Sequence, residues 1–183
     1  MNPLDADVAE VLVPADRLAQ RVRELAAELD RHYAGRRPIL IGVLRGSVYF
    51  LADLSRAMTT PHEIDFMAIS AYGTRHAVTG AVRLLKDLDE EITDRDVVLV
   101  EDIIDTGLTA AYLTRLLRAR RPASFTICTL LDKRVRRIAE SLPIAYVGFE
   151  IPDRFVVGYG LDHRQLYRNL PYIGVLKETV GGG

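Results

Sequence analysis

The sequence lacks several features that mark secreted and membrane proteins. Its single cysteine, Cys128, excludes an internal disulfide, and its place within the apolar run 125–131 predicts a buried small side chain rather than a nucleophile. No apolar run is long enough to cross a membrane, no signal-peptide pattern is present, and the first residues include Asp5 and Asp7. We therefore expect a cytoplasmic protein with no membrane partner.

The sequence also lacks an excess of either charge. Its 24 basic and 25 acidic residues leave a net charge of −1, which provides no global attraction to nucleic acid. The four histidines have no metal-ligand spacing. The arginines do gather locally, and we interpret them as a solvated face or a subunit interface, with nucleic-acid binding as the alternative. They are Arg115, Arg118, Arg120, Arg121, Arg134, Arg136 and Arg137.

What the sequence does contain is an alternation of short apolar runs and amphipathic stretches. With 183 residues, 49% of them apolar, we expect a single domain, residues 1–183. The alternation predicts an α/β fold with a mostly parallel twisted sheet and helices on both faces. The expected strands are 39–44, 64–70, 81–85, 97–103, 125–131, 145–149 and 172–176, and the expected helices follow Asp16, follow Ser47 to about Met58, and cover 108–120. Residues 181–183 are expected to be a frayed tail.

The most informative stretch is 97–109. Four apolar residues predict a buried parallel strand, and Glu101 and Asp102 follow where that strand should end. Asp105 comes next, and then a Thr-Gly-x-Thr turn at 106–109 opens a helix. Free N–H groups, hydroxyls and the helix dipole suit a phosphate, while the carboxylates suit sugar hydroxyls or Mg²⁺. Helix capping with an ordinary turn is the simpler alternative. We favour a phosphorylated sugar held with a divalent metal.

The same stretch resembles the phosphoribosyl diphosphate (PRPP) motif of type I phosphoribosyltransferases, and its form EDIIDTGLT is most similar to the hypoxanthine-guanine phosphoribosyltransferases. The resemblance extends from about Val11 to Lys177. It implies that Glu101 and Asp102 hold the ribose hydroxyls and the metal, and that Asp105 accepts a proton from the purine's N7. The 5′-phosphate would bind the turn formed by Thr106, Gly107, Leu108 and Thr109.

A second segment, Gly42 to Ser47, joins a strand to a helix and does not match the P-loop pattern. By itself it is a simple turn. In the family it resembles the pyrophosphate loop, which implies that Leu44, Arg45 and Gly46 bind pyrophosphate and that the Leu44–Arg45 peptide is cis. Arg168 matches an arginine that also holds pyrophosphate.

The resemblance also implies a purine pocket. Lys133 would recognise the oxygen at position 6 of the base, Phe155 would stack on the ring, and Val156 would contact it through the backbone. Asp162 would lie near a second metal and the purine's 2-position. Without the resemblance, the lysine would be expected in solvent and the run 155–162 would be expected to form a core strand.

The stretch 71–80 is poor in apolar residues and is expected to be a flexible loop. It resembles the family's mobile lid, with Ser70 and Tyr72 as the matching residues and Ala71 in place of a second serine. A lid is chemically sensible, because glycosyl transfer passes through an oxocarbenium-like state that water would intercept.

Together these matches imply a bacterial-type hypoxanthine (guanine) phosphoribosyltransferase of purine salvage. It would join a 6-oxopurine to the ribose C1 of PRPP, with Mg²⁺, giving IMP or GMP and pyrophosphate. A type I fold with a small hood subdomain, and a homodimer or homotetramer, are expected. The alternatives are a transferase for xanthine, adenine or a pyrimidine, an RNA-binding regulator on the same fold, as in pyrimidine-operon attenuators, and a non-catalytic subunit. A Lys133 donor does not match adenine, and the purine-pocket residues argue against a regulator.

Overall fold

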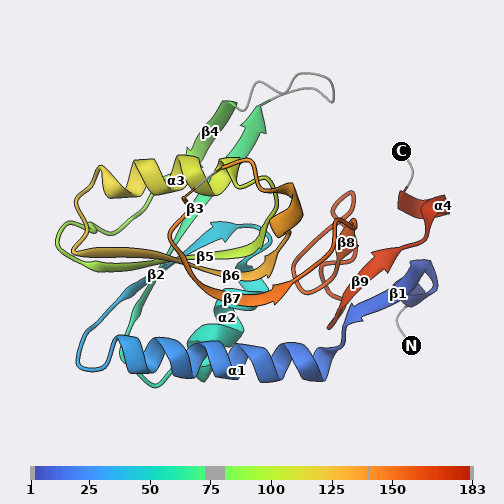
Figure 1. Ribbon diagram of the computed structural model, residues 1–183, viewed down its shortest axis with the longest axis horizontal. Helices are drawn as coiled ribbons and strands as arrows, with labels where there is room; N and C mark the ends of the chain where they lie inside the picture. The colour runs from blue at the N-terminus through green and yellow to red at the C-terminus, as the bar shows by residue number, and fades with distance from the viewer. Residues whose placement is uncertain (1–2, 73–80, 140, 182–183) are drawn as a thin grey trace.

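The computed structural model describes residues 3–72, 81–139 and 141–181. A large sheet lies between helices, and a second, smaller sheet lies at one end beside both described termini (Figure 1). Within the described residues, no helix is long and apolar enough to span a membrane.

The large sheet has six strands in the order β4-β3-β2-β5-β6-β7. The pair β3–β4 is antiparallel and the other neighbours are parallel, so the predicted mostly parallel sheet is confirmed. The central strand β5 is buried along most of its length, as its apolar run predicted. The strands are β2 (Ile39–Leu44), β3 (Glu63–Tyr72), β4 (Ala81–Lys86), β5 (Asp96–Ile104), β6 (Ser124–Asp132) and β7 (Ile144–Glu150).

Helices cover both faces of this sheet. The helices α1 (Ala15–His32) and α2 (Val48–Ala57) lie on one face, and α3 (Leu108–Arg118) lies on the other (Figure 1). The helix expected after Asp16 is α1, and the apolar side chains on one of its faces, Leu18, Val22, Leu25 and Leu29, are buried. Cys128 is buried in the same core, as expected of a small apolar side chain. A short 3₁₀ helix, η2 (Arg134–Arg136), follows β6.

The second sheet has the order β1-β9-β8 and is antiparallel throughout. It comprises β1 (Val8–Val13), β8 (Val156–Val157) and β9 (Ile173–Leu176), with the 3₁₀ helix η1 (Pro3–Asp7) before it and α4 (Glu178–Gly181) after it. This is the smaller unit expected as a hood. The run 155–162 is not one strand, because Gly158 and Gly160 adopt positive φ angles of 98° and 101° and turn the chain.

The first two residues of the expected lid loop, 71–80, do not form a loop in the structure. Ala71 and Tyr72 belong to β3 rather than to a loop, because their backbones pair with Val82 and Ala81 of β4. The ladder therefore extends the strand beyond its apolar run. The rest of the expected lid, residues 73–80, lies outside the described residues, as do residues 182 and 183 of the expected tail.

Candidate active site

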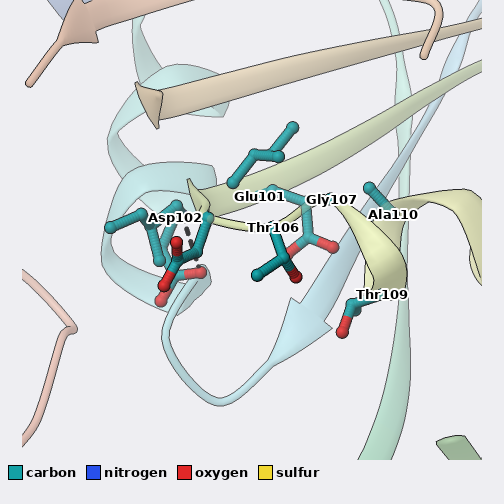
Figure 2. A pocket seen from close by; sticks show the side chains of 9 residues that line it. Glu101, Asp102, Thr106, Gly107, Thr109 and Ala110 are labelled. Atoms are coloured by element: carbon teal, nitrogen blue, oxygen red, sulfur yellow. Dashed lines mark hydrogen bonds between the residues drawn. The ribbon is translucent and has the colours of Figure 1, made fainter. Parts of the chain in front are cut away.

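A cavity of about 190 Å³ lies where β5 gives way to α3. Figure 2 shows its lining, with Thr106 between Asp102 on one side and Thr109 on the other. The structure thus brings together most of the residues predicted to bind PRPP: Glu101, Asp102, Asp105, Thr106, Gly107 and Thr109. The side chain of Leu108 does not line this cavity and is 38% exposed.

The turn that opens α3 is built around Gly107. This residue is the N-cap in the left-handed region, with φ of 80°, and its carbonyl accepts the first helical hydrogen bond from Ala111 at 2.9 Å. On the other side, the carbonyl of Thr106 accepts hydrogen bonds from the N–H groups of Ile138 and Ala139 at 2.9 and 3.1 Å. These hydrogen bonds hold the turn in place. The N-terminus of α3 lies at the cavity, and the N–H groups of its first turn would stabilise an anion there.

The two adjacent acids in the second half of β5, Glu101 and Asp102, are poorly solvated. Glu101 is 5% exposed, and its Oε1 is buried without a hydrogen-bond partner among the described residues. Burial, followed by the charge of Asp102, raises the pKa of Glu101 well above its ordinary value. Burial also raises the pKa of Asp102 to about 6, although the N–H of Ile103, 2.9 Å away, partly offsets it. Such carboxylates favour the approach of a cation or of hydroxyl donors.

A second cavity of about 290 Å³ adjoins the first. The two cavities share Asp102, Ile103 and Asp105, so these residues lie between them. The rest of its lining contains most of the residues predicted for pyrophosphate and purine, contributed by both sheets and their loops. They are Arg45, Gly46, Lys133, Phe155, Val156, Asp162 and Arg168, together with Leu161.

The loop after β2 packs tightly against this boundary. The Leu44–Arg45 peptide is cis, as the resemblance implied, although Leu44 itself does not line the cavity. A Cβ on Gly46 would lie 1.6 Å from Asp102 Oδ2, so a larger residue there would displace the Asp102 carboxylate. Gly160 faces the same loop, since a Cβ on it would lie 2.1 Å from the Gly46 carbonyl oxygen. The hood and the large sheet thus meet at Gly46.

Two arginines line the far side of the second cavity. Arg168 forms an ion pair with Asp162 at 2.8 Å and donates a hydrogen bond to the Gly160 carbonyl at 2.6 Å. Arg45 lies on the loop after β2 and donates to Gln165 Oε1 at 2.9 Å. Two guanidinium groups lining one cavity suit a polyanion.

At the purine end, Lys133 is only 6% exposed, although a lysine after a strand is ordinarily solvated. Its Nζ lies 4.0 Å from Asp105 Oδ2 and 3.8 Å from Asp153 Oδ1. Arg136 completes the group, with its Nε 3.3 Å from Asp105 Oδ1. Asp105 is therefore held between two cations. Phe155 is 55% exposed, and its ring lies perpendicular to that of His163, with 5.5 Å between the ring centroids.

The three acids predicted as metal ligands do not form one centre. In the described part of the chain, no three histidine, cysteine or acidic side chains are arranged to hold a metal ion. Glu101 and Asp102 lie together, and Asp162 interacts with Asp102 through its charge. The oxygen-rich set and the orphaned Glu101 oxygen nevertheless suit a hard cation that takes its remaining ligands from a bound phosphate.

Some residues near the site were missed, and one described residue of the predicted lid does not reach it. Arg136, Asp153 and Gln165 contact predicted site residues, but no local motif distinguishes them, because their partners are distant in sequence. Ser70 is partly buried in β3 and lines neither cavity. The side chain of Tyr72 lies outside the described parts of the structure.

The arginine cluster is divided by acidic partners rather than forming one basic face. Ion pairs link Arg120 to Asp87 at 2.7 Å and Arg134 to Glu150 at 3.1 Å. Arg137 pairs with Asp132, and Arg118 lies over the ring of Phe125. These contacts reduce the positive charge that a nucleic acid would meet.

The chain is similar to known proteins along most of its length. A family model described as a phosphoribosyl transferase domain matches residues 10–164. The chain is 48% identical over 174 residues to the hypoxanthine-guanine phosphoribosyltransferase of Bacillus subtilis, covering 95% of this chain and 96% of that protein. It is also 48% identical over 167 residues to the hypoxanthine phosphoribosyltransferase of Escherichia coli, covering 90% and 93%. A crystal structure of a Staphylococcus aureus hypoxanthine phosphoribosyltransferase superposes with a TM-score of 0.95, at 44% identity over all of both chains.

Proposed function

The chain belongs to the phosphoribosyltransferase family, and on that premise we propose that it is a hypoxanthine (guanine) phosphoribosyltransferase of purine salvage. As such it is a glycosyltransferase that moves the 5-phosphoribosyl group of PRPP to a 6-oxopurine. The products are IMP or GMP and pyrophosphate. The observation that carries the proposal is the position of Asp105, which lines both the phosphate-turn cavity and the cavity of Lys133 and Phe155.

PRPP would occupy the boundary between the two cavities. Its 5′-phosphate would bind at the turn 106–109, where the N–H groups at the start of α3 have no helical carbonyl to donate to. The ribose hydroxyls would meet Glu101 and Asp102, whose raised pKa values reflect burial without a paired cation. The leaving pyrophosphate would lie in the second cavity, where it would contact Arg45 and Arg168.

The purine would lie against Phe155, with Val156 at its edge and Lys133 donating to the oxygen at position 6. As N9 attacks the ribose C1, the C1–oxygen bond to pyrophosphate breaks and the base must lose a proton. Asp105 would accept that proton at N7, the role of a general base. Holding both reactants in adjoining cavities removes much of the entropic cost of bringing them together.

Glu101 and Asp102 would hold Mg²⁺ together with PRPP, and Asp162 would act at the pyrophosphate side. When bound, the cation neutralises the negative charge that the two phosphate groups and the carboxylates bring into one cleft. Without it, the charges of Glu101 and Asp102 would oppose PRPP.

Neither adenine transfer nor RNA binding is supported by the residues of the site and its surroundings. Adenine carries an amino donor at position 6, which an ammonium cannot accept. An RNA-binding regulator would need a continuous basic face, whereas Arg120, Arg134 and Arg137 pair with acids. Hypoxanthine, guanine and xanthine all offer an oxygen at position 6, and their ranking is left to the assay.

We also propose that the protein is a homodimer or homotetramer. The support is an apolar surface on α2, where Val48 and Tyr49 are 38% and 41% exposed next to the pyrophosphate loop. Burying such side chains on a second copy would be favourable. Sedimentation at micromolar protein should give a dimer or larger, and a monomer under those conditions would contradict this part of the proposal.

The function is tested by supplying PRPP and Mg²⁺ with each nucleobase in turn and following pyrophosphate release. We expect turnover with hypoxanthine or guanine, much less with adenine, and none with excess chelator. Full turnover in chelator would contradict the role of the carboxylates toward Mg²⁺. Efficient turnover of adenine or a pyrimidine alone would contradict the 6-oxopurine assignment.

A further inference from the structure

The side chain of Gln165 lies between the two arginines of the second cavity. Its Oε1 accepts a hydrogen bond from Arg45 NH1 at 2.9 Å and a second from Arg168 NH2 at 3.3 Å. Its backbone N–H donates to Asp162 Oδ2 at 2.8 Å, and Asp162 in turn pairs with Arg168. One residue therefore contacts three side chains that line the cavity.

Arg45 depends on this contact more than Arg168 does. Arg168 is also fixed by Asp162 and by the Gly160 carbonyl. Arg45 is exposed, and among the described residues its guanidinium has one hydrogen-bond partner, Gln165. A free arginine side chain must lose considerable rotamer entropy when it is ordered by a ligand. Holding Arg45 in advance lowers that cost.

The chemistry of the amide suits this task. Two guanidinium groups near one site repel each other, and an acceptor between them offsets the repulsion. A carboxylate there would also accept both hydrogen bonds, but its negative charge would oppose an incoming pyrophosphate. A neutral amide orients both cations and leaves their charge available to the ligand.

The backbone around Gln165 gives a second, independent indication. His163 and Leu166 form a two-residue antiparallel hairpin, with N–H to carbonyl distances of 3.2 and 3.0 Å. The central residues, Arg164 and Gln165, have φ angles of 53° and 70°. Positive φ at both positions is typical of a type I′ turn, which favours asparagine and glycine. A glutamine in this strained position is better explained by its side chain than by the turn.

We propose that Gln165 is a positioning residue that holds Arg45 and Arg168 in a pyrophosphate-binding fork. The inference rests on the proposed function, because it takes the pyrophosphate group of PRPP to be the ligand that the two arginines bind. Gln165 acts through the arginines and need not touch the reacting atoms.

The test uses two variants and one control, all in the full-length protein. Gln165→Met keeps the side-chain length but removes the acceptor. Gln165→Gly also removes the acceptor while relieving the positive φ. Gln20→Met alters the exposed glutamine of α1, which donates to Glu24 at 2.9 Å and lies outside both cavities. For each variant, KM is measured for pyrophosphate with IMP, for PRPP, and for hypoxanthine, and the thermal midpoint is recorded.

We expect both Gln165 variants to raise KM for pyrophosphate and PRPP about tenfold, the scale of ordering one or two arginine side chains on binding, with KM for hypoxanthine within about twofold of wild type. Gln165→Gly should keep or raise the thermal midpoint, since glycine tolerates this φ. Unchanged constants for pyrophosphate and PRPP, or an equal rise for hypoxanthine, would overturn the proposal. A wild-type protein that forms no IMP would instead overturn the proposed function.

Discussion

Lys133 shows how the fold changes the environment of a single side chain. It follows β6, where a lysine would ordinarily extend into solvent, yet it is buried and faces Asp105 and Asp153. Its backbone N–H donates to the Ile104 carbonyl at 2.9 Å, which ties the end of β6 to the end of β5. A buried ammonium with two acidic neighbours remains a fixed donor at the purine end of the cavity.

Replacing Lys133 should therefore change the choice of base. Lys133→Met keeps the aliphatic length and removes the charge and the donors. A charge-assisted hydrogen bond contributes about 1.5–3 kcal/mol, or roughly 10- to 160-fold at 1.4 kcal/mol per decade. We expect kcat/KM for hypoxanthine to fall at least about tenfold and the gap to adenine to narrow. Steady-state kinetics with both bases measure this.

Lys177→Met is the matched control, because Lys177 is exposed and donates to the Ala6 carbonyl in the hood. It should retain wild-type kinetics. A Lys133→Met protein with wild-type efficiency and selectivity would show that the ammonium does not recognise the base.

At the scale of elements, the turn before α3 combines an unusual backbone angle with close packing. A Cβ on Gly107 would lie 2.8 Å from Arg137 Cδ and 3.0 Å from Leu142 Cδ1. The segment after η2 therefore packs against the turn, and a side chain at residue 107 would displace Arg137 and Leu142. The phosphate turn is consequently a joint product of α3 and the chain that follows β6.

Gly107→Ala should destabilise the protein and raise KM for PRPP. Gly35→Ala is the matched control, since Gly35 has a similar φ of 73° but nothing within 4 Å of its added Cβ. Both variants carry a left-handed penalty of about 1 kcal/mol or more, and only Gly107→Ala also meets crowding. Urea unfolding and PRPP kinetics compare them. Equal losses of stability together with an unchanged KM would contradict the crowded turn.

The contact between α1 and the chain after α2 depends on one carboxylate. Asp30 Oδ2 accepts hydrogen bonds from the N–H and hydroxyl of Thr59 at 2.9 and 2.8 Å, and Oδ1 accepts from the N–H of Thr60 at 2.8 Å. Burial alone would raise the pKa of Asp30, but the hydrogen bonds from Thr60 and Thr59 outweigh it, so the pKa is lowered.

The sign of the pH effect follows from that lowered pKa. Asp30 contributes stability above its unfolded value of about 3.9, and the contribution is lost as pH falls through the folded pKa. Asp30→Asn should lower the free energy of unfolding by about 1–3 kcal/mol near neutral pH. The difference from wild type should narrow as the pH approaches about 3.

Urea titrations across this range provide the measurement, with the exposed Asp94→Asn as control. A deficit in Asp30→Asn that stays constant with pH would mean that the charge of Asp30 does not stabilise the fold.

At the scale of the whole molecule, the large sheet could be predicted from sequence because each of its strands is a local apolar run. The helix α1 was predictable from another local pattern, because Leu18, Val22, Leu25 and Leu29 recur at helical spacing between charged residues. Strand β1 was not, because only Val13 is fully buried in it and its partner β9 lies near the other end of the chain. Pairing over such a distance leaves little local signal.

The candidate site likewise contains residues that could be predicted from sequence and residues that could not. The residues 101–109 form one contiguous motif, and the structure places nearly all of their side chains in one cavity. Gln165 and Arg136 show no such pattern, since their partners are Arg45 and Asp105, far away in sequence. The arginine cluster shows that closeness in sequence can also mislead. Its residues are near one another in the sequence, but in the fold Arg120 and Arg134 pair with different acidic residues.

The central claim is that Asp105 performs the proton transfer at the boundary of the two cavities. Asp105→Asn keeps the shape of the side chain and leaves the turn at Gly107 intact. The direct measurement is the single-turnover rate of IMP formation with saturating PRPP, Mg²⁺ and hypoxanthine, which product release does not limit. We predict a fall of about 10²- to 10⁴-fold, with much less change in PRPP affinity. A wild-type rate in Asp105→Asn would contradict the account.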